Sequence, residues 1–270
     1  MYEVKPNNIY NVDCLEGMKL ITDGTIDMIL CDLPYGTTSC AWDALIPFGH
    51  LWNEYRRIIK PTGAVILTAS QPFTTTLIGS NMEWFKYSWV WVKTNCSGFA
   101  NAKKQPLRSY EDVPVFYNKQ PTYNPQGLIR LKSPKIRTKD TGNFMGRTGF
   151  KDGYTQEFTK YPKNVLTISS ERSTIHPTQK PVALFEYLIR TYTNRGELVL
   201  DNCIGSGTTA IACINSDRRY IGFELDADYY VKALNRIQFY KPCSEEFNPT
   251  ITAPLMHLPS PLASIDALFD

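Results

Sequence analysis

Four short apolar segments of this 270-residue chain each end at an acidic residue. They are residues 8–12 before Asp13, 26–31 before Asp32, 197–200 before Asp201 and 220–223 before Glu224. Segments with helical spacing alternate with these runs, which is typical of an α/β fold with a doubly wound, mainly parallel, Rossmann-like sheet. In such a sheet the carboxyl ends of the strands meet at one edge. The sequence therefore predicts that the four acids face one crevice.

The same patterns predict the remaining elements. Further strands are expected at residues 64–69, 87–92 and 113–117, and helices at 14–21, 47–60, 72–78, 181–191, 207–216 and 228–240. Residues 61–63, Pro-Thr-Gly, are expected to end the second helix. The aromatic residues near the fourth strand are expected in the core; they are Trp84, Phe85, Trp89 and Trp91.

Residues 118–163 lose this periodicity, and Gly, Pro, Lys, Arg and Thr accumulate there. We interpret the segment as a loop-rich insertion without regular elements. Residues 99–163 hold thirteen Lys and Arg against five Asp and Glu, a local charge of +8, although the whole chain carries only +3. Such a basic segment favours a polyanion partner, with a solvated basic surface as the alternative.

Composition argues against several classes of protein. No run of 18 apolar residues is present and the first ten residues lack a signal-like apolar stretch, so a cytoplasmic protein without a membrane anchor is expected. The seven cysteines form no CxxC pair, and the three histidines are scattered. The sequence therefore predicts free thiols and no metal site.

Two turns carry the chemistry. Asp32-Leu33-Pro34-Tyr35 places a carboxylate, main-chain carbonyls and an aromatic ring close together, a set that suits an exocyclic amino group on a planar heterocycle. After Asp201, residues 202–210 form a glycine loop that opens a helix. Glu224 follows nineteen residues after Gly205, a spacing at which an acid can bind the hydroxyl groups of a ribose. Alone, that loop fits a nicotinamide dehydrogenase as well as any other adenosine binder.

Together with His176-Pro-Thr-Gln-Lys-Pro181, these turns resemble the β-group of S-adenosylmethionine-dependent DNA amino-methyltransferases. In that group the catalytic motif precedes a basic target-recognition region, and the cofactor glycine loop follows near the C-terminus. The resemblance covers about residues 7–240. It implies a catalytic half at 1–117, a target-recognition insertion at 118–165, a cofactor half at 166–240 and a Pro-rich tail at 241–270. Leu33 departs from the family's usual proline, although its main-chain carbonyl is the group that the family uses.

The resemblance also implies roles for single residues. Asp32, Leu33, Pro34 and Tyr35 would be catalytic, with Tyr35 stacking on a base extruded from the DNA. S-adenosyl-L-methionine would be held by Asp13 at its adenine, by Glu224 at its ribose, and at its methionine portion by Asp201 and the loop. Its expected contacts are Asp13, Cys14, Thr178, Gln179, Lys180, Asp201, Cys203, Gly205, Ser206, Gly207, Thr208 and Glu224. Lys180 is expected opposite the methionine carboxylate.

Adenine N6 is the favoured target, since an acid at the first motif position usually accompanies adenine in this family. Cytosine N4, an inactive DNA-binding protein of the same fold and glutamine methylation in a protein remain the alternatives. Double-stranded DNA is the expected partner, and a second copy of the chain and a sliding clamp, through residues 264–269, are further candidates. The candidate DNA contacts are Lys103, Lys104, Arg108, Arg130, Lys132, Lys135 and Arg137.

Overall fold

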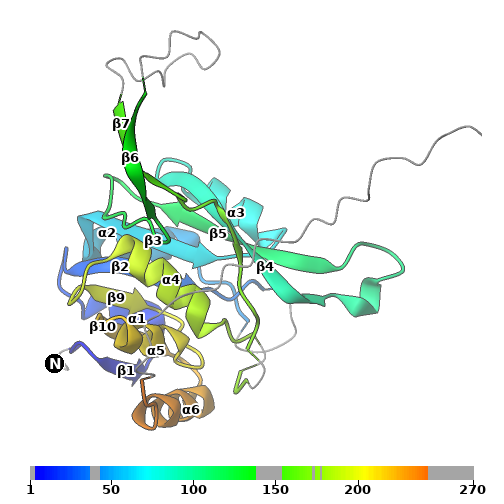
Figure 1. Cartoon of the computed structure of the whole chain (residues 1–270). Helices are drawn as coiled ribbons and strands as arrows, with labels where there is room; N and C mark the ends of the chain where they lie inside the picture. Colours follow the sequence, from blue (N-terminus) through cyan, green and yellow to red (C-terminus); the bar gives the residue numbers. More distant parts are fainter. Residues whose placement is uncertain (1–3, 37–42, 138–153, 172–173, 177, 243–270) are drawn as a thin grey trace, which may run out of the picture.

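An eight-stranded sheet forms the centre of the protein in a computed structural model that describes residues 4–36, 43–137, 154–171, 174–176 and 178–242 (Figure 1). Its strand order is β1-β10-β9-β2-β3-β5-β4-β8. The strands are β1 (Asn8–Asn11), β2 (Ile26–Asp32), β3 (Ile59–Thr68), β4 (Phe85–Ser97), β5 (Arg108–Phe116), β8 (Val165–Thr167), β9 (Leu198–Asp201) and β10 (Arg219–Glu224). The five strands from β1 to β3 in that order are parallel, and β5 runs antiparallel to both β3 and β4. The predicted mainly parallel α/β fold is therefore confirmed.

Helices cover both faces of the sheet. One face packs against α1 (Cys14–Lys19), α2 (Phe48–Ile58) and α3 (Phe73–Ser80), and the other against α4 (Val182–Tyr192), α5 (Thr208–Asn215) and α6 (Ala227–Gln238). No helix in the described part of the chain is long and apolar enough to cross a membrane.

Strand β2 shows why the sheet is buried on both sides. Met28 and Leu30 point into the core beneath α4 and α5, whereas Ile29 and Cys31 point into the core beneath α1 and α2. Side chains alternate across a strand, so a continuous apolar run supplies both cores at once. This explains why the central strands read as unbroken apolar runs in the sequence.

The structure corrects the prediction that residues 118–163 lack regular elements. Strands β6 (Ile129–Arg137) and β7 (Tyr154–Thr159) pair antiparallel in a separate two-stranded sheet that projects from the body of the protein (Figure 1). Both faces of this ribbon are largely exposed, and Ile136 is 82% accessible. A ribbon without a core-facing side needs no alternation of apolar and polar residues, so the sequence gives no periodic signal.

A second correction concerns the end of α2. The helix stops at Ile58, before the expected end at residue 60, and β3 begins at Ile59 and runs through the Pro-Thr-Gly segment that was expected to end the helix. Ile59 pairs with Ile26, and the Lys60 ammonium lies 2.5 Å from the Asp27 carboxylate on β2. Pairing with the neighbouring strand therefore overrides the local preference of Pro61 and Gly63 for a turn.

Gly222, in the middle of β10, lets the loop after β9 lie directly on the sheet. A Cβ atom there would stand 2.2 Å from Cδ1 of Ile204 and 2.9 Å from Cγ2 of Ile9. The Ile204 amide donates to the Phe223 carbonyl at 2.8 Å, which holds the loop in this position.

Replacement of Gly222 by alanine should therefore destabilise the protein by roughly 1–3 kcal/mol, because the new methyl group overpacks the site. Thermal unfolding measures the effect. Gly79→Ala in α3 is the matched control, since nothing lies within 4 Å of a Cβ at that position. An unchanged melting temperature in G222A would contradict this account of the loop.

Candidate active site

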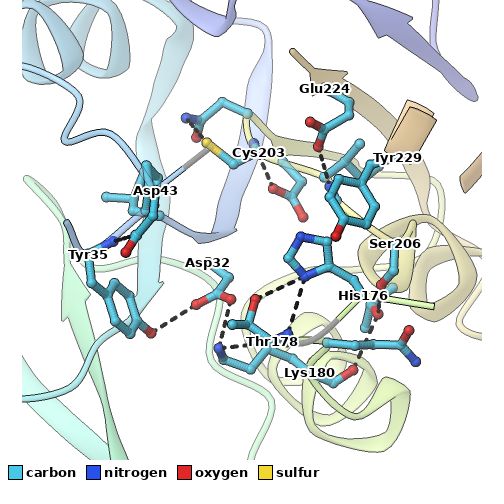
Figure 2. Close-up of a pocket in the computed structure, with 18 of the residues that line it drawn as sticks. Asp32, Tyr35, Asp43, His176, Thr178, Lys180, Cys203, Ser206, Glu224 and Tyr229 are labelled. Atoms are coloured by element: carbon cyan, nitrogen blue, oxygen red, sulfur yellow. Dashed lines mark hydrogen bonds and ion pairs between the residues drawn. The ribbon is translucent and has the colours of Figure 1, made fainter. Parts of the chain in front are cut away.

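A cavity of about 850 Å³ opens at the carboxyl edge of the parallel strands. Figure 2 shows that side chains from both halves of the sequence point into it. All four acids singled out in the sequence, Asp13, Asp32, Asp201 and Glu224, line this one cavity. The strand ends therefore meet as the parallel topology requires.

Asp32, the last residue of β2, is the most heavily hydrogen-bonded of these acids. Its Oδ1 accepts a hydrogen bond from the Tyr35 hydroxyl at 2.8 Å and another from the Thr68 hydroxyl, and its Oδ2 accepts one from the Lys180 ammonium at 2.7 Å. Leu33 is buried and lines the cavity beside it. The carboxylate is thus held in one orientation by three donors.

The turn after Asp32 is held by contacts with Asp43 and Phe73. The Asp43 carboxylate accepts hydrogen bonds from the backbone amides of Tyr35 and Gly36, at 2.8 and 2.9 Å. The Tyr35 ring stacks on Phe73, with centroids 4.9 Å apart. One face of Tyr35 is therefore engaged by the protein itself, and its hydroxyl is directed to Asp32.

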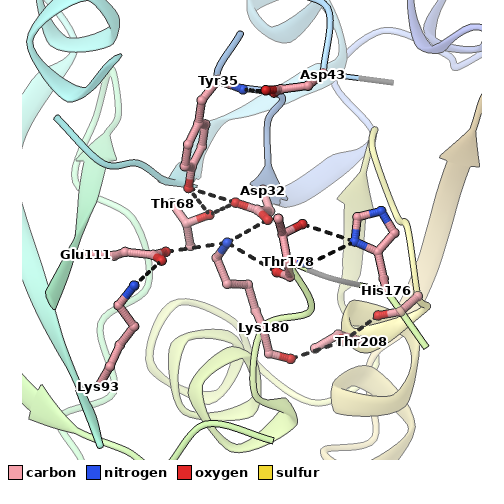
Figure 3. Close-up of polar contacts among 11 residues, drawn as sticks. Asp32, Tyr35, Asp43, Thr68, Lys93, Glu111, His176, Thr178, Lys180 and Thr208 are labelled. Carbon is pink, nitrogen blue, oxygen red and sulfur yellow. Dashed lines mark hydrogen bonds and ion pairs between the residues drawn. The ribbon is translucent and has the colours of Figure 1, made fainter. Parts of the chain in front are cut away.

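Lys180 lies between two carboxylates (Figure 3). Its ammonium contacts Asp32 at 2.7 Å and Glu111 Oε2 at 3.4 Å, and only 6% of its side chain is accessible. Burial lowers the pKa of Lys180, but the carboxylates of Asp32 and Glu111 outweigh it and raise the pKa above its usual value. The expected partner of Lys180 was the methionine carboxylate; in the structure its partners are the protein's own acids.

Asp201 stands at the start of the glycine loop. Its Oδ1 accepts a hydrogen bond from the Cys203 amide at 3.1 Å, and its Oδ2 accepts one from the Thr209 hydroxyl. Burial raises the pKa of Asp201 to about 7, although these donors oppose the shift. A cation placed beside this carboxylate would restore its ionised form.

Glu224 closes the other side of the loop. Its two oxygens accept hydrogen bonds from the backbone amides of Gly205 and Asp226, at 2.8 and 2.9 Å. Burial raises the pKa of Glu224, and both amides partly offset the rise. Gly207, with φ of +80°, ends the loop and packs against Ile237 of α6.

Asp13 and His176 also line the cavity, and each is held by local contacts. Asp13 caps α1 through one oxygen, which accepts the amides of Leu15 and Glu16 at 2.9 and 3.2 Å. His176 packs against Tyr229 of α6, with ring centroids 4.2 Å apart, and its Nδ1 lies 3.0 Å from the Thr178 hydroxyl. Burial lowers the pKa of His176.

The structure gathers nearly all predicted catalytic and cofactor residues at this cavity. Its lining includes Asp13, Cys14, Asp32, Leu33, Pro34, Tyr35, Thr178, Gln179, Lys180, Asp201, Cys203, Gly205, Ser206, Thr208 and Glu224. Gly207 is absent from the lining and acts instead as the turn between loop and helix. The residues nominated for DNA lie elsewhere, with Lys103, Lys104 and Arg108 exposed on the β4–β5 hairpin and Arg130, Lys132 and Lys135 exposed on β6. Arg137 is the last residue of β6.

Several lining residues were not predicted. Asp43, Lys93, Glu111, Asp226 and Tyr229 come from segments without a recognisable motif. Lys93 and Glu111 face each other across β4 and β5, and only knowledge of that pairing would have placed them at the site. Asp226 carries a local signal, because it caps α6 by accepting the amides of Asp228 and Tyr229.

Comparison with known proteins identifies the family. The model of the N6 and N4 DNA methylases matches residues 26–235, which is more than half of the chain. The chain belongs to the N6/N4 DNA methylase family. The methylase is also 28% identical over 257 residues to the DNA adenine methyltransferase YhdJ of Escherichia coli K12, covering 88% of this chain and 85% of that protein.

Two solved structures share its fold. The M1.HpyAVI–SAM complex superposes with a TM-score of 0.58 at 25% identity, covering 85% of this chain and 98% of that one. The cytosine-N4-specific PvuII DNA methyltransferase superposes with a TM-score of 0.65 at 16% identity, covering 89% and 88%. Enzymes named for adenine and for cytosine thus both resemble the methylase.

S-adenosyl-L-methionine, the cofactor predicted from the sequence, is confirmed as the cofactor of this family. The lining fits this cofactor, because the carboxylates of Asp13, Asp201 and Glu224 can accept hydrogen bonds from the ammonium, hydroxyl and amino groups that it carries. No group of three or more His, Cys, Asp or Glu side chains in the described ranges could hold a metal ion. Residues 264–269, nominated for a sliding clamp, lie outside the described residues.

Proposed function

We propose that the methylase transfers a methyl group from S-adenosylmethionine to the exocyclic N6 of adenine in double-stranded DNA. The observation that supports this most is the single cavity shared by the Asp32–Tyr35 turn and the Asp201–Glu224 pair. An acid stands at the first position of the catalytic motif, and the relative YhdJ is named for adenine. Cytosine N4 is the second candidate, because the PvuII enzyme of the same fold is named for it.

The proposed chemistry depends on positioning. The amino nitrogen of a nucleobase is a poor nucleophile because its lone pair is delocalised into the ring. Asp32 and the Leu33 carbonyl each accept a hydrogen bond from one of its N–H groups, which draws the nitrogen toward tetrahedral geometry and frees the lone pair. The cofactor would supply a methyl group on a sulfonium: the S–CH₃ bond would break as the N–CH₃ bond forms, the sulfur would leave as a neutral thioether, and one amino proton would pass to water. A base inside a duplex cannot reach Asp32, so the target nucleotide has to be extruded.

The first test is Asp32→Ala. This variant should lose methyl transfer to DNA in an assay with labelled cofactor, because no carboxylate remains to accept a hydrogen bond from the amino group and position it. Cofactor affinity, measured by calorimetry, should stay close to that of the wild-type protein, since Asp201 and Glu224 are untouched. Full activity in D32A would refute the assignment.

The second test uses the raised pKa of Asp201. We assign the methionine ammonium to this carboxylate, so binding should favour its ionised form and strengthen as the pH rises toward and through about 7. Calorimetry between about pH 6 and 7.5, where the ligand's α-amino group stays mostly charged, should show affinity rising roughly three- to tenfold.

Asp201→Asn should bind more weakly and lose most of this slope. A smaller slope should remain, because burial raises the pKa of Glu224 as well. Asp13→Asn, at the opposite end of the assigned cofactor site, is the control that should keep the slope. An equal pH dependence of cofactor affinity in D201N and the wild-type protein would contradict the assignment of the methionine ammonium to Asp201.

The third test concerns the two exposed basic hairpins, which we propose bind the DNA backbone. Reversing the charge of Lys132 and Lys135, or of Lys103 and Lys104, should lower the slope of log affinity against log salt by about one for each phosphate that the protein no longer neutralises. Lys19→Glu with Arg195→Glu is the charge-matched control, because both residues are exposed and precede the amino ends of β2 and β9, away from the cavity. Equal effects of all three pairs would indicate a general charge effect.

A further inference from the structure

Four charged side chains of alternating sign form a continuous chain beside the cavity (Figure 3). We call Lys93, Glu111, Lys180 and Asp32 the charge chain. Lys93 contacts Glu111 Oε1 at 2.9 Å, Glu111 Oε2 lies 3.4 Å from Lys180, and Lys180 contacts Asp32 at 2.7 Å. Their side chains are 12%, 13%, 6% and 21% accessible, so water screens these charges poorly.

The hydrogen bonds of Asp32 leave one direction of approach. A carboxylate accepts about four hydrogen bonds, two at each oxygen. Oδ1 accepts from Tyr35 and Thr68, whereas Oδ2 accepts only from Lys180 among the described residues. An amino group entering the cavity would therefore bind at Oδ2, directly beside the Lys180 ammonium.

This position has an electrostatic consequence for the proposed reaction. A nitrogen that gains a methyl group carries a positive charge until its proton leaves. An uncompensated ammonium next to that nitrogen would oppose the reaction. Glu111 faces Lys180 from the side away from Asp32 and is itself held by Lys93, so a negative charge stands ready to offset the ammonium.

We propose that Glu111 is a positioning residue for methyl transfer, which acts through Lys180. The Glu111 carboxylate offsets the charge of the ammonium at 3.4 Å, so that Lys180 orients Asp32 without making Oδ2 unavailable to the target amino group. The lowered pKa of Glu111, which burial alone would raise but Lys180 and Lys93 depress, agrees with a carboxylate that stays ionised in this setting. The inference rests on the proposed function and names a residue to which the sequence assigned no role.

The decisive variant is Glu111→Gln, which keeps the shape of the side chain and removes its charge. The single-turnover rate of methyl transfer at saturating cofactor and DNA should fall by roughly 10- to 100-fold, while the affinity for S-adenosylmethionine stays within about twofold. Glu186→Gln is the matched control, because Glu186 is another buried glutamate paired with an arginine, Arg190 at 2.7 Å, and lies on α4 outside the cavity lining. E186Q should keep the wild-type rate.

Lys180→Met tests whether Glu111 acts through the lysine. In a K180M background, adding E111Q should change the rate by less than about twofold, because the charge that Glu111 offsets is gone. Multiplying effects in the double variant would show that Glu111 acts independently and would overturn the proposal. If K180M is too slow to measure, the contrast between E111Q and E186Q decides.

A binding measurement supplies a readout apart from activity. The wild-type protein should bind a duplex with the target base more tightly than one whose target base lacks the amino group, and E111Q should lose this preference as Lys180 withdraws Oδ2. An unchanged rate and preference in E111Q would sink the inference and leave the proposed function intact. Wild-type protein that methylates no DNA would instead refute the proposed function.

Discussion

The ion pair between Lys180 and Asp32 connects the two halves of the methylase at the point where its cavity is formed. These residues are 148 positions apart in the sequence, yet their charged atoms lie 2.7 Å apart. Asp32 ends β2, and Lys180 ends the segment that enters α4. A buried pair of this kind contributes little to net stability once desolvation is counted, but loss of either partner strands a charge in a poorly hydrated place. The pair therefore serves chiefly to define geometry.

The parallel sheet explains why so much of the cavity could be anticipated. Asp13, Asp32, Asp201 and Glu224 each follow an apolar run, and a parallel topology gives such residues a common edge. The glycine loop and the His-Pro-Thr-Gln-Lys-Pro segment add local motifs that can be recognised in the sequence alone. Strand ends and tight turns are local features, and local features are what a sequence records most directly.

Other parts of the site depend on pairing that no local pattern reveals. Glu111 reaches Lys180 only because β5 runs antiparallel between β3 and β4, and Asp43 contacts the turn after Asp32 by accepting hydrogen bonds from two of its amides. The same limit applies to Lys180, whose positive charge predicted an anionic partner but not which one. The β6–β7 ribbon was missed because its exposed faces carry no periodicity.

The ribbon's separation from the main sheet has an evolutionary consequence. Within the described ranges, strands β6 and β7 pair only with each other, and the chain returns from them to the edge strand β8. Substitutions on the ribbon leave the hydrogen bonding of the eight-stranded sheet and the packing of both cores unchanged. The ribbon can therefore change in sequence and length while the sheet that forms the cavity keeps its geometry.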